Sequence, residues 1–417
     1  RQALSVNSGA SQHQFNMLER ELFSDLRPEL RAGFGYQFQE GEATTNRLHS
    51  WGFPNQLSLS LTPQLRMRAG ATPRRFYLPD SSVSPRRNFG IQYLVGATAQ
   101  YWDRLVLDGD FSITHFTQTD YNNINYRAQA RYQLFDEMSI RVGSRRNTLS
   151  NSLLAVAGYR PNDGAYANRR LGPANETAVF AEINTQPFLN VDWNLGYEWA
   201  VITGSDEMPV NYKNQFYTSL GYTHRFNPKH SIRAAYEFLA FTFSKNATNG
   251  YFDVEADVTS PLSVLRPVAR ADSGYDFGGY FSPDRFFLNA FRLDYRGSLF
   301  NKFLEYKLGG SLGVQAFEHG FGIQDSDPTS MASAFNVALK LNFTDWIAAY
   351  GRTNFMDSGG LFSRWRFEGG LILRPNFSAL TPMFSKGEKP HKPDRSVIDR
   401  NTFKDANFDH QDYKFYN

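Results

Sequence analysis

The feature that most restricts the fold is a two-residue alternation of apolar and polar side chains through most of the chain. In residues 30–38, Leu, Ala, Phe, Tyr and Phe alternate with Arg, Gly, Gly and Gln, and residues 191–201 and 335–343 repeat the pattern. Successive side chains of a β-strand point to opposite faces, so this period predicts strands whose two faces meet different surroundings. Each apolar face spans about 9 to 12 residues, close to the length that a tilted strand needs to cross a bilayer.

The composition excludes several other classes of protein. The chain has 417 residues, of which 41% are apolar and 16% aromatic, and its mean hydropathy is −0.49. No apolar run approaches the roughly 18 residues of a transmembrane helix, and so many aromatic residues are not typical of a disordered chain. A net charge of +3 does not indicate a nucleic-acid partner. The absence of cysteine excludes disulfides and thiolate metal sites.

The start of the sequence leaves the cellular compartment open. From Arg1 onward there is no basic and apolar signal segment. We therefore expect either a cytosolic protein or a mature or truncated part of an exported one.

Seven short connections share one form, an aromatic residue followed within two positions by Asn or Asp. They lie at residues 53–55, 102–103, 135–136, 188–190, 226–227, 300–301 and 343–345. Asn and Asp favour tight turns, and aromatic residues at strand ends suit a membrane interface. The connections between these turns are longer. Seven short turns on one side and eight longer loops on the other predict sixteen strands with both chain ends on the short-turn side.

We therefore predict an all-β fold, a 16-stranded antiparallel transmembrane β-barrel of the bacterial outer membrane with both termini periplasmic. The expected strands are residues 28–39, 43–52, 56–69, 88–100, 104–116, 122–134, 138–149, 176–186, 190–202, 212–225, 230–244, 285–298, 302–317, 333–342, 345–355 and 363–377. The alternative is a large soluble β-sandwich or propeller. It is disfavoured because it would not separate Trp, Tyr and Leu from Arg, Asn and Glu on so many long strands.

Residues 28–377 form the predicted barrel, and two shorter segments flank it. Residues 1–27 are predicted to be a periplasmic linker with a short helix, because Phe15, Leu18, Leu22 and Leu26 mark one helical face. Residues 378–417 are predicted to be a polar periplasmic tail.

The alternation of odd and even positions along each strand, here called parity, also predicts which charged side chains face the lumen of the barrel. They are Arg66, Arg68, Arg104, Asp108, Asp110, Arg127, Arg131, Arg141, Arg145, Glu198, Arg233, Glu237, Arg292, Asp294, Arg296, Glu305, Lys307, Lys340, Arg364, Arg366 and Glu368. This mixed set, with Arg in excess, can bind an anionic solute. The favoured interpretation is that Arg and carboxylate ladders hydrate and brace a wide barrel.

Parity also points Tyr217, Phe241, Phe303 and Phe317 inward. Inward rings can stack against sugars or anchor a loop that folds into the lumen, and the sequence does not separate these alternatives.

Signatures of catalysis are weak. The eight His residues show no metal-ligand spacing, and there is no nucleophile elbow, phosphate-binding loop or dinucleotide fingerprint. We expect no metal, no cofactor and no enzyme activity. An outer-membrane hydrolase would need a Ser/His/acid set near the rim, where His115 and His319 lie near strand ends.

One segment is more distinctive than the alternation. Residues 278–283, Gly-Gly-Tyr-Phe-Ser-Pro, lead into an expected strand. Together with the stretches 296–306, 55–63, 334–355 and 363–377, this segment resembles the C-terminal outer-membrane β-barrel of the bacterial cellulose synthase exopolysaccharide exporter family. The similarity covers most of residues 28–377. The chain differs from that family in having no 34-residue helical repeat and in carrying the tail 378–417.

The resemblance implies an outer-membrane pore that exports a nascent exopolysaccharide, cellulose or a related glucan. The implied partners are outer-membrane lipid, the polysaccharide chain, a periplasmic tetratricopeptide-repeat scaffold and an inner-membrane synthase complex, with no nucleic acid. The loop from Lys245 to Asp284 is the expected gate, with Tyr275, Tyr280 and Phe281 as contacts for the gate or the polymer. The rival functions are a general or solute-specific porin and an outer-membrane hydrolase.

Overall fold

The structure of the chain is a computed structural model. It describes residues 28–40, 48–62, 64–77, 87–101, 104–117, 121–149, 173–188, 190–204, 210–227, 229–244, 282–300, 303–318, 329–344, 346–358 and 363–375. The predicted segments 1–27 and 378–417 and most of the proposed gate lie outside these residues. Within them, no helix is long and apolar enough to cross a membrane.

The described residues form one antiparallel β-sheet that closes on itself. Its segments are β1 (Glu29–Glu40), β2 (Leu48–Gly52), β3 (Asn55–Thr62), β4 (Leu65–Tyr77), β5 (Arg87–Tyr101), β6 (Leu105–Phe116), β7 (Tyr121–Phe135), β8 (Met138–Thr148), β9 (Asn175–Phe188), β10 (Val191–Thr203), β11 (Asn211–Asn227), β12 (His230–Phe243), β13 (Arg285–Leu299), β14 (Leu304–Glu318), β15 (Thr329–Asn342), β16 (Ile347–Asp357) and β17 (Ser363–Leu373). Strands β1 and β17 pair in continuous register from Leu30↔Leu373 to Glu40↔Ser363, which closes the barrel. A closed wall leaves no unpaired sheet edge, as a bilayer requires.

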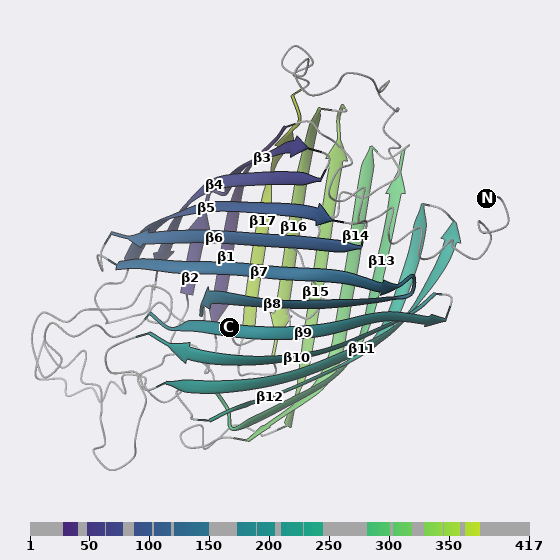
Figure 1. The fold of residues 1–417 in the computed structure, drawn as a ribbon. Coiled ribbons are helices and arrows are strands. Elements are labelled where there is room, and N and C mark those ends of the chain that lie inside the picture. The colour runs from purple at the N-terminus through teal and green to yellow at the C-terminus, as the bar shows by residue number, and fades with distance from the viewer. Residues whose placement is uncertain are drawn as a thin grey trace, which may run out of the picture.

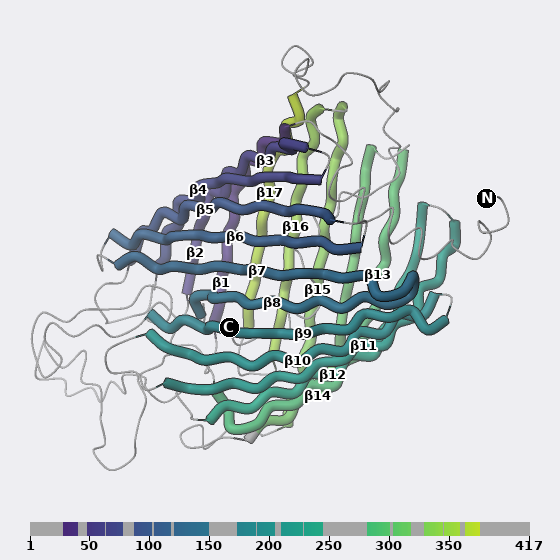
Figure 2. The backbone as a smooth tube through the Cα atoms, viewed as in Figure 1, coloured from purple at the N-terminus to yellow at the C-terminus, as the bar shows by residue number. Residues whose placement is uncertain are grey.

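Segments β2 and β3 are two halves of one barrel strand, because both pair with β1 on one side and with β4 on the other. The seventeen segments therefore make sixteen strands, as predicted. In Figure 1, strands β4 to β10 lie across the near side of the barrel, and strands β13 to β17 run behind them at a steep angle, as tilted barrel strands do. Figure 2 shows the same wall as a continuous tube.

The first predicted turn is wrong. The chain does not reverse at residues 53–55 but between Thr62 and Leu65, so the predicted strand 56–69 spans the real turn. Phe53 and Pro54 only interrupt a strand, since the Phe53 N–H donates to the Pro73 carbonyl at 3.0 Å and the Pro54 carbonyl accepts from the Gly33 N–H at 2.9 Å. The other six short turns are confirmed by the strands that they join.

The two faces of the wall differ as the alternation predicts. The outer face carries large apolar side chains that stay well exposed, such as Tyr197, Leu220 and Leu312 at 50 to 58%. The positions between them point inward and hold mainly charged, polar and small residues, apart from one buried apolar cluster that includes Leu239, Phe241 and Phe286. This apolar outer band and polar interior are the pattern of transmembrane barrels, and the low mean hydropathy follows from it.

Candidate transport pathway through the barrel

The inward face is asymmetric in its exposure. From β10 to β15, nearly every inward side chain in the central part of each strand is buried, whereas many inward side chains from β16 through β1 to β8 remain partly exposed. The exposed fraction is 36% for the Arg127 side chain and 51% for the Arg366 side chain. The accessible lumenal surface in the described part of the chain therefore lies on the β16 to β8 side.

Four buried charges join strands β8 to β11. The Arg145 guanidinium lies 3.0 Å from the Glu176 carboxylate and 2.7 Å from that of Glu198. The Lys213 ammonium lies 3.1 Å from Glu176 and 3.7 Å from Glu198. Each side chain is 5% exposed or less. Two cations and two anions cancel, so the quartet links four strands without adding net charge to the lumen.

A second network crosses β4 to β7 on the accessible side. Arg68 contacts Asp108 at 2.9 Å and Asp110 at 2.7 Å, and Arg127 contacts the same two carboxylates at 3.2 and 2.7 Å. Gly96 on β5 leaves room for these groups, because a Cβ there would lie 2.9 Å from the Arg68 Nε and closer still to Asp110. The missing side chain is thus what lets the network cross β5.

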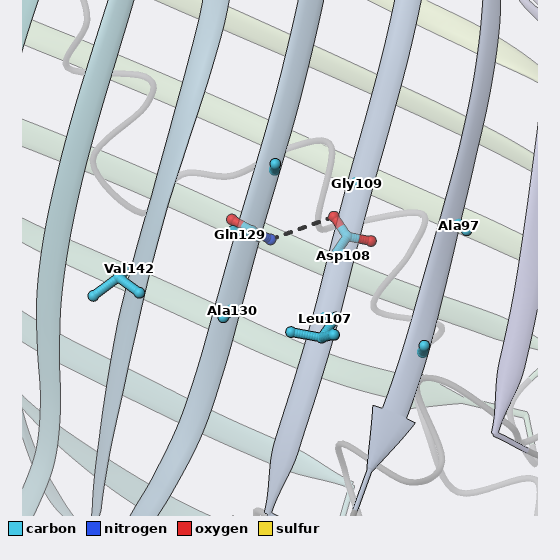
Figure 3. A pocket seen from close by; sticks show the side chains of 9 residues that line it. Ala97, Leu107, Asp108, Gly109, Gln129, Ala130 and Val142 are labelled. Carbon is cyan, nitrogen blue, oxygen red and sulfur yellow. Dashed lines mark hydrogen bonds between the residues drawn. The ribbon is translucent and has the colours of Figure 1, made fainter.

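Figure 3 shows the wall at this network, with Gln129 donating to Asp108 at 3.4 Å. On the other side of the same strands, small residues leave a shallow depression of about 520 Å³. Leu107 and Val142, two of the residues that line it, belong to the exposed apolar face. The depression therefore faces the membrane and is not part of the lumen.

Most other lumenal charges are also paired across or along the strands. The pairs are Arg141–Glu182, Arg233–Asp192 at 2.5 Å, Arg292–Asp294 at 2.9 Å, Arg292–Glu237 at 3.7 Å, Arg352–Glu368 at 2.5 Å, Arg366–Glu368 at 3.6 Å and Arg66–Glu29 at 4.0 Å. Parity also places Arg131, Arg296 and Arg364 inward, and the Arg131 Nε donates to Ser139 at 3.3 Å. This pairing favours the bracing interpretation of the charged rows over a site for an anionic solute.

Several lumenal charges were missing from the sequence-based set, among them Glu29, Glu176, Lys213 and Arg352. Parity could have found Lys213, which shares a face of β11 with Tyr217. Glu29 shows a different limit, since it bonds to Arg374 at 2.9 Å across the closure of the barrel. That contact depends on the closing register, which the sequence does not state.

Three of the four predicted inward aromatic residues come together. Tyr217, Phe241 and Phe317 are all less than 5% exposed and share one cluster with Phe286. The rings of Phe241 and Phe286 stack with their centroids 4.5 Å apart. With covered faces, these rings do not offer an open platform for sugars.

Phe303 does not join this cluster, so the parity that pointed it inward fails there. It lies in the turn before β14, is 42% exposed, and packs edge-on against Phe343 at 6.1 Å. The reason is local, because Phe300 adopts a positive φ of 51° and the chain turns before strand parity begins.

Tyr275, Tyr280 and Phe281 lie outside the described residues. The described chain resumes at Ser282 and Pro283, both buried, and enters β13 at Arg285.

The described residues offer no constellation for hydrolysis at His115. Its Nδ1 lies 2.9 Å from the Asn122 side-chain oxygen, on the outer face of β6. Among the described residues, no group of three His, Asp or Glu side chains converges as a metal site. His319 is outside the described residues.

Comparisons with known proteins agree with the architecture. No protein-family model and no curated protein sequence matches the chain. Its fold is similar to that of a solved bacterial polysaccharide outer membrane secretin, with a TM-score of 0.55 and 12% identity over 84% of this chain and 99% of that one. The chain is an outer-membrane β-barrel. A weaker similarity is to CdiB from Acinetobacter baumannii, with a TM-score of 0.46 and 7% identity over 82% of this chain and 60% of that one. Another is to OccK3 from Pseudomonas aeruginosa, with a TM-score of 0.39 and 11% identity over 85% of this chain and 96% of that one.

Proposed function

We propose that this barrel conducts a nascent exopolysaccharide, cellulose or a related glucan, across the outer membrane. The observation that carries the proposal is the chemistry of the accessible lumenal wall. Guanidinium and amide groups such as Arg127, Gln129 and Arg366 line it, while carboxylates neutralise most of the neighbouring cations. A polar wall with little uncompensated charge suits an uncharged, hydroxyl-rich polymer, which forms hydrogen bonds without a fixed charge of its own.

Two further observations support the same choice. The solved structure with the TM-score of 0.55 is described as a polysaccharide outer membrane secretin. The segment 278–283 and the strands around it resemble the cellulose synthase exopolysaccharide exporter family.

In this proposal the barrel performs no chemistry. An inner-membrane synthase complex extends the polymer, a periplasmic tetratricopeptide-repeat scaffold guides it, and elongation drives it through the lumen. The segment 245–284 gates the pore, with Tyr275, Tyr280 and Phe281 in contact with the polymer or closing the lumen at rest. The buried cluster of Tyr217, Phe241 and Phe317 anchors the inner wall.

Conductance in planar bilayers tests the transport step. In the variant that lacks residues 250–280, whose pore we expect to be open, cello-oligosaccharides of increasing length on the periplasmic side should give current blocks whose duration grows with chain length. Arg366→Ala should shorten these blocks, whereas Leu371→Ala, which alters the outer face of the same strand, should not. Passage of small solutes with no length-dependent block would contradict polymer conduction and indicate a porin.

The gate is tested separately. We expect removal of residues 250–280 to open a pore that is closed in the intact protein. Tyr280→Ala together with Phe281→Ala should increase the entry of large antibiotics into cells. A wide pore already open in the intact protein would contradict gating by this segment without affecting the polymer experiment.

A further inference from the structure

The outer face of the barrel carries an ordered group of aromatic and cationic side chains at one end of β1, β2, β4 and β5. Strand register arranges them in two rows. One row is Tyr36, Trp51, Arg75 and Phe89, and the other is Phe38, His49, Tyr77 and Arg87. We call these eight residues the cationic aromatic patch.

Contacts within the patch hold its rings in place. The Tyr36 hydroxyl and the His49 Nδ1 are 2.7 Å apart, and the His49 ring stacks on Trp51 with centroids 5.9 Å apart. The Arg87 guanidinium lies over the Tyr77 ring, 5.4 Å from its centroid. A guanidinium over an aromatic face is held without being neutralised.

The patch faces the membrane. Its neighbours at alternating positions, Leu48 and Phe76, point inward and pack in a buried cluster with Phe116. Phe89 in the patch is 38% exposed, and both Arg75 and Arg87 are exposed.

Parity shows that outward-facing arginines on the described strands occur only toward the long-connection end, at Arg75, Arg87, Arg146 and Arg285. Long connections face the cell exterior in outer-membrane barrels. Arg75 is ten residues beyond the start of β4 at Leu65. At about 3.3 Å per residue and a tilt of roughly 40°, it lies about 25 Å above that point, at the upper edge of the apolar band.

The two patch arginines differ from most lumenal arginines in having no carboxylate partner. Among the described residues, neither Arg75 nor Arg87 forms an ion pair, while Arg68, Arg145 and Arg233 each contact one or two acids. Glu40 lies on the same outer face, at the opposite edge of the patch from Arg87. Arg75 and Arg87 are diagonal neighbours across β4 and β5, with Cα atoms about 7 to 8 Å apart. Two uncompensated guanidiniums at this spacing suit phosphate oxygens.

We propose that the cationic aromatic patch binds a phosphorylated glycolipid of the outer leaflet, of the lipid A type. Arg75 and Arg87 contact its phosphates, and the rings of Tyr36, Trp51 and Phe89 pack against its sugar and upper acyl chains. The external position of the patch distinguishes this ligand from inner-leaflet phospholipids. The site is separate from the lumen, so it stands whatever polymer the barrel conducts.

Binding of defined lipids to the purified full chain in detergent tests the proposal. We expect bisphosphorylated lipid A to bind about tenfold or more tightly than its dephosphorylated form, and more tightly than phosphatidylglycerol. Arg75→Gln with Arg87→Gln should reduce lipid A binding to the dephosphorylated level. The matched control is Arg146→Gln, an outward arginine on β8 outside the patch, which should bind as the unaltered chain does.

Three outcomes would overturn the site: equal binding of both forms of lipid A, equal binding of phosphatidylglycerol, or full binding by the double variant. If the double variant does not fold, the comparison of lipids on the unaltered chain still tests the first two outcomes. Arg75→Lys with Arg87→Lys keeps the charge and should retain part of the phosphate preference.

Discussion

Arg145 shows how the lumen holds charge at the scale of single residues. Its guanidinium is almost fully buried between the carboxylates of Glu176 and Glu198, and Lys213 contacts both of these acids as well. A buried charge is tolerated only when it is paired, so each member of the quartet depends on the others.

We expect Arg145→Met to lower the free energy of unfolding by about 3 to 5 kcal/mol, because it leaves Glu176 and Glu198 buried with one cation between them. Arg366→Met is the matched control. It removes an arginine that is half exposed and 3.6 Å from Glu368, so its effect should stay within about 1 kcal/mol. Urea titration of the barrel in detergent, followed by the loss of the fast-migrating folded band on gels, measures both. Equal losses would contradict the structural role of the quartet.

At the scale of elements, the sequence predicts most strands to within a few residues, because alternation and aromatic turn signals agree. The second strand is the exception. Phe53-Pro54-Asn55 has the same form as the real turns, but here Pro54 interrupts a strand whose neighbours remain hydrogen-bonded. Whether a proline ends a strand or only bends it depends on the N–H and C=O groups that the adjacent strands offer, and the local sequence does not specify these groups.

The same limit applies to the candidate site. Parity placed Arg68, Arg233 and Arg292 inward, but it could not tell which acids they meet or that the ring of Phe241 is covered. Those facts depend on the combined register of several strands, such as that of β4 with β5 and of β5 with β6, which together bring Arg68 to Asp108 and Asp110.

The position of the first turn gives a prediction for paired insertions. A short epitope between Pro63 and Gln64 should leave the barrel folded, because it lengthens an exposed turn. The same epitope between Phe53 and Pro54 should prevent folding, since it separates residues that bond to Gly33 and Pro73 on the two adjacent strands. Heat-modifiable migration of the two proteins compares them. If the protein with the second insertion folded and the protein with the first did not, the result would support a turn at residues 53–55 instead.

At the scale of the whole molecule, the antiparallel pairing of β1 with β17 closes the barrel and also fixes which connections share one end. Eleven residue pairs join β1 to β17, and the Glu29–Arg374 contact lies at the short-turn end of this closure. All short turns then lie at one end of the barrel and all long connections at the other, and only one end can face the periplasm.

Orientation can be measured directly because the chain has no cysteine. Lys229 lies in the short turn between β11 and β12, and Val210 lies at the opposite end, just before β11, and is 41% exposed. We expect Val210→Cys to react with a membrane-impermeant maleimide in intact cells. Lys229→Cys should react only after the outer membrane is permeabilised, and the unaltered chain should not react at all. If Lys229→Cys alone were labelled in intact cells, the barrel would have the opposite orientation in the membrane. It would also place the cationic aromatic patch at the inner leaflet, where lipid A is not the lipid it would meet.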